Sequence, residues 1–485
     1  MNGETGASFW VTRLVFQRAL GFLYFIAFVN ALNQFKPLLG EHGLLPVPQF
    51  VRETTFAETP SLFHFFPTDR AFTLAAWLGI ILSCLALTGI SDRFNLGISV
   101  GVWGAIWVLY LSFVNVGQTF YGFGWESILL EAGFYAMFLG PQSVAPPKAA
   151  IWLLRWLLFR IMFGAGVIKL RGDACWRDFT CLDYHYETQP MPNVWSWYFH
   201  WAPEWTHRAG VGFNHLAELI IPFGYFLPSP ISAVCGIVTI IFQGLIMASG
   251  NLSWLNLLTL ILAIPLLNDR WLGFLPFQAQ APPSNLVFQI ASYIMASVIA
   301  VMSVNPIRNL LSPRQMMNFS YNPLHLASTY GAFGSITRPR YEIIIEGTDA
   351  AAVDAHTVWR DYEFKGKPGA LDRRPPQIAP YHLRIDWLMW FAAMSSYPQH
   401  PWFVHLMAKL LQGDAASTAL LGANPFPDHP PHFVRAELYE YHFATPAEHR
   451  ATGAWWTRKF VGEYFPMVSL ETPGFRRLLQ QMDWL

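Results

Sequence analysis

The stretch "KLRGDACWRDFTCLDYHYETQPMPN", residues 169–193, directly follows an apolar segment and contains two of the four cysteines of the chain. It also holds a dense set of charged and aromatic residues, and its end, "QPMPN", stops any helix. A long apolar segment that ends in such a loop is typical of a helix that crosses a membrane and leaves it. The stretch therefore predicts a bundle of membrane-crossing helices with a polar loop at one end.

The composition of the chain supports a membrane protein. Of its 485 residues, 53% are hydrophobic and only 13% are charged, whereas a soluble globular protein carries about 25% charged residues. The aromatic content of 16% suits side chains that lie at membrane interfaces. Because the formal net charge is zero, nothing indicates binding to nucleic acid. We therefore predict membrane lipid, and no nucleic acid, as a partner.

The hydropathy pattern divides the chain into a helical part and a more polar part. A membrane-spanning helix needs about 20 mainly apolar residues. Nine segments meet this description: 14–32, 71–90, 95–114, 123–140, 150–169, 209–227, 230–248, 251–267 and 285–304. We therefore predict a polytopic α-helical membrane bundle of about nine spans, residues 1–304. Two exterior loops, 33–70 and 170–208, belong to this transmembrane domain.

Basic residues indicate the orientation of the bundle. The side that carries the N-terminus is flanked by Arg13, Arg93, Lys148 and Arg270. The positive-inside rule makes this side cytoplasmic. After an odd number of spans, everything beyond about residue 305 then lies on the non-cytoplasmic side.

Residues 305–485 have the composition of a folded domain outside the membrane. Hydrophobic runs become short and charges return. The pattern predicts strands at 340–347 and 435–443, and helices with one apolar face at 384–394 and 401–411. About 180 residues are enough for a hydrophobic core. We predict a non-cytoplasmic α+β domain, built as a small β-sandwich with helical insertions.

The two cysteines of the opening stretch, Cys175 and Cys181, are separated by five residues in a loop that we assign to an oxidising compartment. A local disulfide that staples the loop is our main interpretation. Because the spacing is not C-x-x-C, a catalytic exchange role has little support. Free thiols are the remaining alternative. The other two cysteines, Cys84 and Cys235, lie in apolar segments as small buried side chains.

Several polar residues lie within or next to the predicted spans. They are Glu126, Glu131, Arg160, Lys169, His215, Glu218, Gln243, Asn251 and Asn256. Ionisable groups are costly in hydrocarbon, so we expect them to face the bundle interior and to be paired. His215 and Glu218 are three positions apart and share a helix face. Two interpretations stay open: a charge-paired network that joins the helices, or a catalytic or ligand site with Lys169, whose pKa burial would lower.

The exterior loop supplies further candidate residues. They are Arg171, Asp173, Trp176, Asp178, His185 and Glu187. We interpret the loop as a cap over the outer mouth of the bundle, with charges that pair or reach lipid head groups. The chain contains no P-loop, no Rossmann glycine motif, no G-x-S-x-G and no H-E-x-x-H. We therefore predict no metal and no cofactor.

Long stretches of the chain resemble the lipase maturation factor family. The resemblance is carried by "GVIKLRGDACWRDFTCLDYHYETQPMPN" (166–193), "FNHLAELIIPF" (213–223), "WRDYEFKGKPG" (359–369), "APYHLRIDWLMWFAA" (379–393) and "NPFPDHPPHFVRAELYEYHF" (424–443). It implies a polytopic membrane protein, resident in the endoplasmic reticulum in animals. A non-cytoplasmic C-terminal domain would help secreted lipases to fold and assemble into dimers. The client surface would lie in residues 310–485, and the chain would be a chaperone-like factor rather than an enzyme.

A shorter segment resembles a second family. "AGVIKLRGDACW" (165–176) is similar to the helix end that carries the essential lysine in the vitamin K-dependent carboxylase superfamily. This resemblance places Lys169 at the position of that lysine. It implies an alternative function, an intramembrane enzyme that acts on a lipid or quinone-like substrate around Lys169. The polar loop and the C-terminal domain follow the maturation-factor pattern instead.

The sequence departs from the animal maturation factors in three ways. The C-terminal domain contains no cysteine, the loops are short, and no KDEL-type retrieval signal is present. These features favour the plasma membrane of a bacterium. In a eukaryote, we would expect the membrane of the endoplasmic reticulum.

Overall fold

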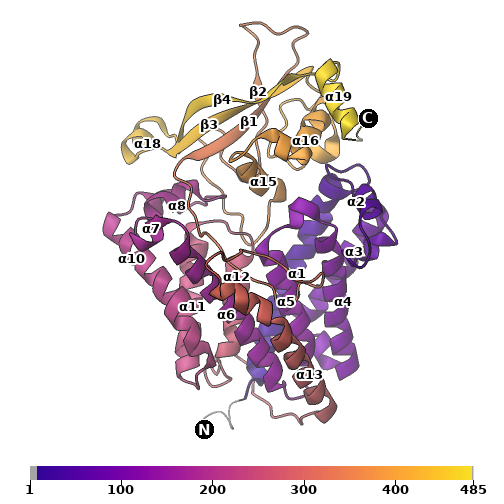
Figure 1. Ribbon diagram of the computed structural model, residues 1–485, viewed down its shortest axis with the longest axis vertical. Helices are drawn as coiled ribbons and strands as arrows, with labels where there is room; N and C mark the ends of the chain where they lie inside the picture. The colour runs from indigo at the N-terminus through magenta and orange to yellow at the C-terminus, as the bar shows by residue number, and fades with distance from the viewer. Residues whose placement is uncertain (1–7, 483, 485) are drawn as a thin grey trace.

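The computed structural model describes residues 8–482 and 484 and shows a helical bundle with a mixed domain on one end (Figure 1). Six helical segments are long and apolar enough to cross a membrane. They are α1 (Trp10–Leu39), α3 (Asp69–Leu87), α4 (Leu96–Asn115), α6 (Lys148–Arg171), α11 (Ile231–Ser249) and α13 with α14 (Leu286–Leu311). These helices confirm the predicted polytopic membrane bundle.

The other three predicted spans fall on shorter or interrupted helices. α5 (Gly124–Ala136) and α12 (Leu255–Ala263) each end in a short 3-10 turn. α10 (Glu204–His215) continues into a π-helical turn, Leu216–Ile220, and a 3-10 turn that contains Pro222. The absent backbone N–H of proline prevents a regular helix there. The count of nine spans therefore stays a prediction.

Short helices and loops lie at both ends of the bundle. At the N-terminal end, the Asp269 carboxylate accepts hydrogen bonds from the backbone N–H of Trp10 and Thr12, so residues 268–285 lie beside the start of α1. The opposite end carries four short helices: α2 (Val47–Glu53), α7 (Ala174–Arg177), α8 (Leu182–Thr188) and α9 (Ser196–His200). The C-terminal domain lies on the same end (Figure 1).

The C-terminal domain is built on one antiparallel sheet. Its strands are β1 (Arg340–Thr348), β2 (Arg360–Asp361), β3 (Phe433–Phe443) and β4 (Trp456–Val468), in the order β2-β1-β3-β4. The register pairs Ile343 with Leu438 and Tyr439 with Phe460. The predicted strands and the α+β class are confirmed.

The predicted β-sandwich is wrong, because the described residues of this domain form a single sheet and helices pack on its strands. α15 (Arg384–Ala392) lies against β1 and α16 (Pro401–Leu411) against β3. Phe403 of α16 places its ring 5.9 Å from that of Phe465 on β4. Three further short helices complete the domain: α17 (Ala415–Thr418), α18 (Pro446–Thr452) and α19 (Pro473–Gln481).

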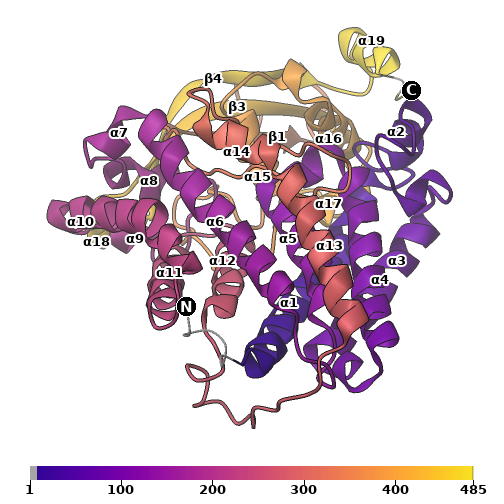
Figure 2. The same ribbon diagram turned by 60° about the horizontal axis from the view of Figure 1, so that its bottom comes forward.

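α1 is long enough to extend beyond the bundle and contact the C-terminal domain. A helix of 30 residues is about 45 Å long, which exceeds the roughly 30 Å hydrocarbon core of a membrane. Near its end, the side chains of Asn30 and Gln34 donate hydrogen bonds of 2.5 and 2.7 Å to the backbone carbonyl of His382. Residues of both parts belong to one continuous hydrophobic core. In Figure 2, α13 lies along the outside of the bundle, where it packs on α6.

Candidate functional site

A cavity of about 720 Å³ lies where the bundle meets the C-terminal domain. Its walls come from α5, α6, α8, α10, α11 and α12 on the bundle side, and from α15 and residues 317–335 on the domain side. Most of the lining is apolar and aromatic, including Trp176, Phe213, Phe242 and Trp387. Ligand pockets typically measure about 300–1,000 Å³, so the cavity has the size of a binding site.

An ion pair forms part of the cavity wall. Lys169, near the end of α6, donates from Nζ to both carboxylate oxygens of Glu218 at 2.6 and 2.7 Å. Glu218 lies in the π-helical turn after α10, a geometry that is frequent at functional sites. Both side chains are about 5% exposed. The ring of Trp176 lies 4.9 Å from Nζ. The Lys169 ammonium group is therefore contacted by the Glu218 carboxylate and by the Trp176 ring, and the ion pair is neutral overall.

His215, the third residue of the predicted cluster, does not join this pair. It ends α10, and its Nε2 lies 2.9 Å from the backbone carbonyl oxygen of Trp176. It is not among the residues that line the cavity. The π-helical turn that contains Glu218 begins at the next residue, and of the two side chains only that of Glu218 lines the cavity.

Three amides extend the polar part of the wall. Asn256 of α12 donates to Gln243 of α11 at 2.7 Å, and Gln243 in turn donates to the sulfur of Met162 at 3.3 Å. Asn214 lines the cavity one helical turn before Glu218, and its Oδ1 is buried without a hydrogen-bond partner among the described residues. Sequence reasoning missed Asn214, although its i,i+4 spacing to Glu218 was visible.

Glu126 and Glu131 belong to two other buried networks, of which only the second reaches the cavity wall, through Tyr330. Glu126 of α5 accepts a 2.8 Å hydrogen bond from Arg384 of α15 and another from Tyr110. Glu131 is paired with Arg160 of α6 and accepts hydrogen bonds from Tyr135 and Tyr330, the latter at 2.8 Å. All four charged side chains are at most 1% exposed. Neither carboxylate lines the cavity.

Asn251 joins three loops rather than facing the cavity. Its Oδ1 accepts hydrogen bonds from the backbone N–H of Ile378 and Ala379 at 2.8 and 2.9 Å. Its Nδ2 donates to the carbonyls of Pro192 and Pro376 at 3.1 and 2.8 Å. The residue thus attaches the C-terminal domain to the start of α12.

The exterior loop is stapled as predicted, because a disulfide joins Cys175 to Cys181. Asp173 caps α7 by accepting a 3.0 Å hydrogen bond from the N–H of Cys175. Trp176 donates from Nε1 to the carbonyl of Phe333 at 2.8 Å, which attaches the loop to the domain-side wall of the cavity.

The remaining loop candidates have different roles. Arg171 donates to Gln315 at 2.9 Å, and Asp178 is exposed. Glu187 accepts a 2.7 Å hydrogen bond from the backbone N–H of Phe443 in β3. His185 is buried and lines the cavity. Burial, together with the charge of Lys169, lowers the pKa of His185 to about 4, so its ring is neutral at pH 7.

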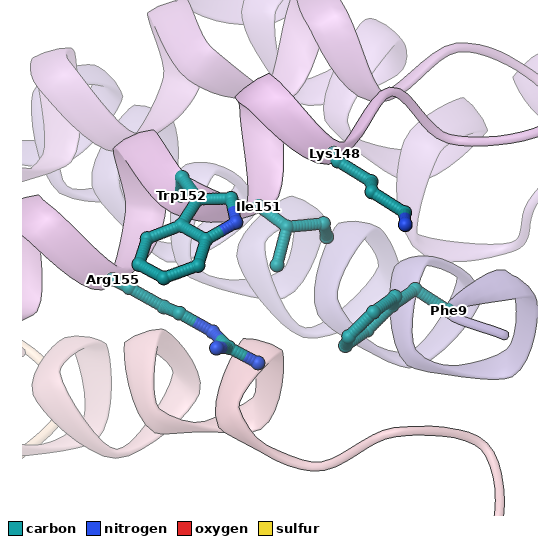
Figure 3. A pocket seen from close by; sticks show the side chains of 5 residues that line it. All are labelled: Phe9, Lys148, Ile151, Trp152 and Arg155. Carbon is teal, nitrogen blue, oxygen red and sulfur yellow. The ribbon is translucent and has the colours of Figure 1, made fainter. Parts of the chain in front are cut away.

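A second hollow at the N-terminal end of the bundle is too small for a ligand. It measures about 10 Å³ and is lined by the five residues of Figure 3: Phe9, Lys148, Ile151, Trp152 and Arg155. This is the space of one water molecule. Arg155 donates to the carbonyls of Pro265 and Tyr225, both at 3.2 Å. It therefore attaches α6 to the ends of the interrupted spans.

The cavity contains no site for a metal ion in the part of the chain that the structure describes. Residues 8–482 and 484 include no group of three or more His, Cys, Asp or Glu side chains that could hold one. The chemistry available to the site is hydrogen bonding from amides and one ion pair beside a large aromatic surface.

The fold and the cavity define an integral membrane protein with an α+β domain fixed on one end of its bundle. Comparison with known proteins shows the family. The model of the lipase maturation factor transmembrane domain matches residues 11–274, and that of the lipase maturation factor C-terminal domain matches residues 326–466. The chain belongs to the lipase maturation factor family.

Individual relatives are similar over nearly the whole chain. Lipase maturation factor 1 of Homo sapiens is 44% identical across 97% of this chain and 90% of its own length. The Mus musculus protein of that name is 43% identical across 98% of this chain and 90% of its own length. Lipase maturation factor 2 of Homo sapiens is 28% identical across 97% of this chain and 84% of its own length. No solved structure matches the chain significantly.

Proposed function

We propose that this protein is a membrane-anchored maturation factor that helps secreted lipases to fold or to assemble. The observation that carries the proposal is the match of both parts of the chain, bundle and C-terminal domain, to one family of that name. The alternative of an intramembrane carboxylase-like enzyme is not favoured by these relatives. It also has no support from Lys169, whose amine is engaged by Glu218.

The proposal includes a division of labour within the chain. Residues 1–304 anchor the protein, and residues 305–485 form the non-cytoplasmic domain that meets the client. Arg93, Lys148 and Arg270 are exposed at the bundle end that carries the N-terminus, which supports a cytoplasmic location for that end. The host membrane would be the plasma membrane of a bacterium or, in a eukaryote, that of the endoplasmic reticulum.

The edge of the sheet offers a surface for a client within residues 310–485. β4 has only β3 as a neighbour among the described strands, so one row of its backbone groups faces outward. Such an edge can pair with an extended segment of another chain. Phe460, Val461 and Met467 on this strand are 55%, 48% and 42% exposed. We propose that a partly folded lipase adds a strand here and covers these side chains.

A deletion experiment tests the function. Removal of the gene from its own host, in a strain without a second copy, should lower the activity of secreted lipases while leaving their transcripts unchanged. Restoring the full chain should restore the activity. Unchanged lipase activity in the deletion strain would contradict the proposal.

Paired substitutions test the client surface. Phe460→Glu combined with Met467→Glu should reduce capture of the lipase by the full chain about tenfold, the equivalent of roughly 1.4 kcal/mol. Phe274→Glu is the matched control, because Phe274 is 81% exposed in the loop between α12 and α13, outside the C-terminal domain. If the control reduces capture as much as the β4 variant, the client does not bind β4.

A further inference from the structure

The cavity between bundle and domain combines features that belong to a ligand site rather than to a packing defect. Its volume of about 720 Å³ is far larger than the few water-sized voids of an ordinary protein interior. Its lining is mostly apolar, and most of its polar groups lie on α6, α10, α11 and α12 or in the π-helical turn after α10. The others include His185 of α8 and Asn318 and Ser335 of the domain-side wall. Empty space of this kind between aromatic side chains forfeits many dispersion contacts. A ligand with a long apolar part would restore them.

The charges in the wall exclude an ionised ligand. Lys169 and Glu218 neutralise each other through two short hydrogen bonds. His207 lines the cavity too, and its ring nitrogens are engaged by Asp183 and the carbonyl of Phe199, both at 2.9 Å. His185 is neutral at pH 7. A carboxylate or phosphate head group would therefore be buried without a free counter-charge, which costs several kcal/mol.

The amides of the wall define what the polar part of the ligand must carry. Asn214 is only 7% exposed, and its Oδ1 is buried and accepts no hydrogen bond within the described chain. A hydroxyl group of a ligand would satisfy it. The Nε2 of Gln243 donates only to a thioether sulfur, a weak acceptor. An ester carbonyl would be a better partner. The wall thus offers an acceptor on α10 and a donor on α11.

The rim of the cavity indicates where the ligand comes from. Leu245 lines the cavity, yet its side chain is 49% exposed on α11, one of the helices that can cross the membrane. Leu245 therefore gives the cavity an edge on the surface of a helix that can cross the membrane, whereas Met317 and Phe391, 44% and 40% exposed, form its edge on the domain side. A hydrocarbon chain can enter past Leu245 without crossing water.

We propose that this cavity binds an uncharged acyl lipid whose head carries a free hydroxyl and an ester carbonyl, as in a diacylglycerol or a monoacylglycerol. The lipid enters from the membrane past Leu245, its hydroxyl donates to Asn214, and its carbonyl accepts from Gln243. Its acyl chain fills the aromatic part of the cavity. The proposal is one of binding and involves no reaction, so it does not depend on the lipase client.

Photolabelling of the full chain tests this site. The protein, reconstituted in nanodiscs of phosphatidylcholine, is irradiated with a photoactivatable long-chain diacylglycerol, and the labelled peptides are mapped by mass spectrometry. Label is expected on the peptides that contain Phe213 and Leu245. Unlabelled diacylglycerol should compete, whereas oleate, phosphatidylserine and cholesterol should not. Label spread evenly over the lipid-facing helices, or equal competition by oleate or cholesterol, would overturn the proposal.

Two substitutions refine the assignment. Asn214→Leu and Gln243→Leu should each reduce specific labelling about tenfold, because each removes one polar partner of the head group. Gln17→Leu is the matched control, since Gln17 is a buried amide of the bundle that does not line the cavity. The competition series on the unmodified protein decides the question if a variant fails to fold. Labelling that survives both cavity substitutions in folded protein would also overturn the proposal.

Discussion

Two kinds of buried ion pair occur in the molecule, one between the bundle and the C-terminal domain and one at the wall of the cavity. Arg384 and Glu126 are at most 1% exposed, neither side chain lines the cavity, and the Arg384 guanidinium lies over the ring of Tyr121. Lys169 and Glu218 are almost as buried by area, about 5% exposed, but one side of the pair faces a cavity of about 720 Å³. The first pair joins two parts of the molecule, whereas the second lies at the edge of an open space. Burial alone therefore does not distinguish a structural pair from a site.

The difference has an energetic consequence. In a sealed pair, removal of one partner leaves the other charge with no water and no counter-charge. In the pair at the cavity, water or a ligand can replace the lost partner, so the cost is smaller. The loss of unfolding free energy on removal of one partner therefore reports how well each pair is shielded from water.

Arg384→Met should have the largest effect. It removes the 2.8 Å hydrogen bond to Glu126, together with hydrogen bonds to the carbonyl of Phe120 and to Asn30 of 2.7 and 2.8 Å. Loss of one partner of a sealed pair costs about 3–5 kcal/mol. The free energy of unfolding, measured by denaturant titration in mild detergent, should fall by that amount.

Two further variants serve as controls for this substitution. Glu126→Leu combined with Arg384→Met removes both charges, so it should restore at least half of the lost stability. Arg476→Met breaks an exposed pair with Glu471 and should change the stability by less than about 1 kcal/mol. A loss for Arg384→Met no larger than for Arg476→Met would mean that the pair does not seal the junction.

Lys169→Met should cost less than Arg384→Met, about 2–3 kcal/mol. Glu218 keeps access to the cavity after the substitution, and its desolvation is incomplete. The same unfolding titration compares the two variants side by side. Equal losses would show that water or a ligand reaches Glu218 no more easily than it reaches Glu126, and would contradict the distinction between the two pairs.

The helices and strands with strong local patterns were predicted from the sequence. Six spans follow from long, mainly apolar runs, and β1 and β3 from short β-branched and alternating stretches. β4 was missed because Gly462, Pro466 and the charges of Arg458 and Lys459 interrupt its pattern. The β-sandwich was wrong because nothing local says whether a helix or a sheet covers the second face of a strand.

The site could be predicted only in part, because its contacts join distant parts of the chain. The cost of charge in a membrane singled out Lys169 and Glu218, but 49 positions separate them, and their pairing is a property of the packed helices. The contact of Arg384 with Glu126 was not expected at all, since 258 positions separate the two residues. The cavity itself has no sequence signature.

Removal of the disulfide tests how the cap of the cavity is stabilised. Cys175→Ser combined with Cys181→Ser releases a loop whose ends are six positions apart. A closed loop of this length contributes about 2 kcal/mol through the entropy of the unfolded chain. Reducing agent should lower the stability of the unmodified protein by a similar amount and leave the double variant unchanged. Cys84→Ser, at a free cysteine, should have no such effect. Equal sensitivity of both proteins to reductant would contradict this role.

The smallest effect concerns pH and the cavity wall. The pKa of His185 is lowered from 6.5 to about 4 by burial and by Lys169. The unfolded chain therefore binds a proton between pH 6.5 and 4 that the folded chain does not, so stability is lost as the pH falls. From pH 7 to pH 5.5, this residue should account for a loss of about 1 kcal/mol.

His185→Gln removes the titrating group, so the variant should lose about 1 kcal/mol less than the unmodified protein over that range. The stability contributed by the Arg384–Glu126 pair should not depend on the charges in the cavity wall, whereas the pKa of His185 should depend on them. If the difference between the two proteins persists unchanged after Lys169→Met, His185 does not sense the charge in the cavity wall.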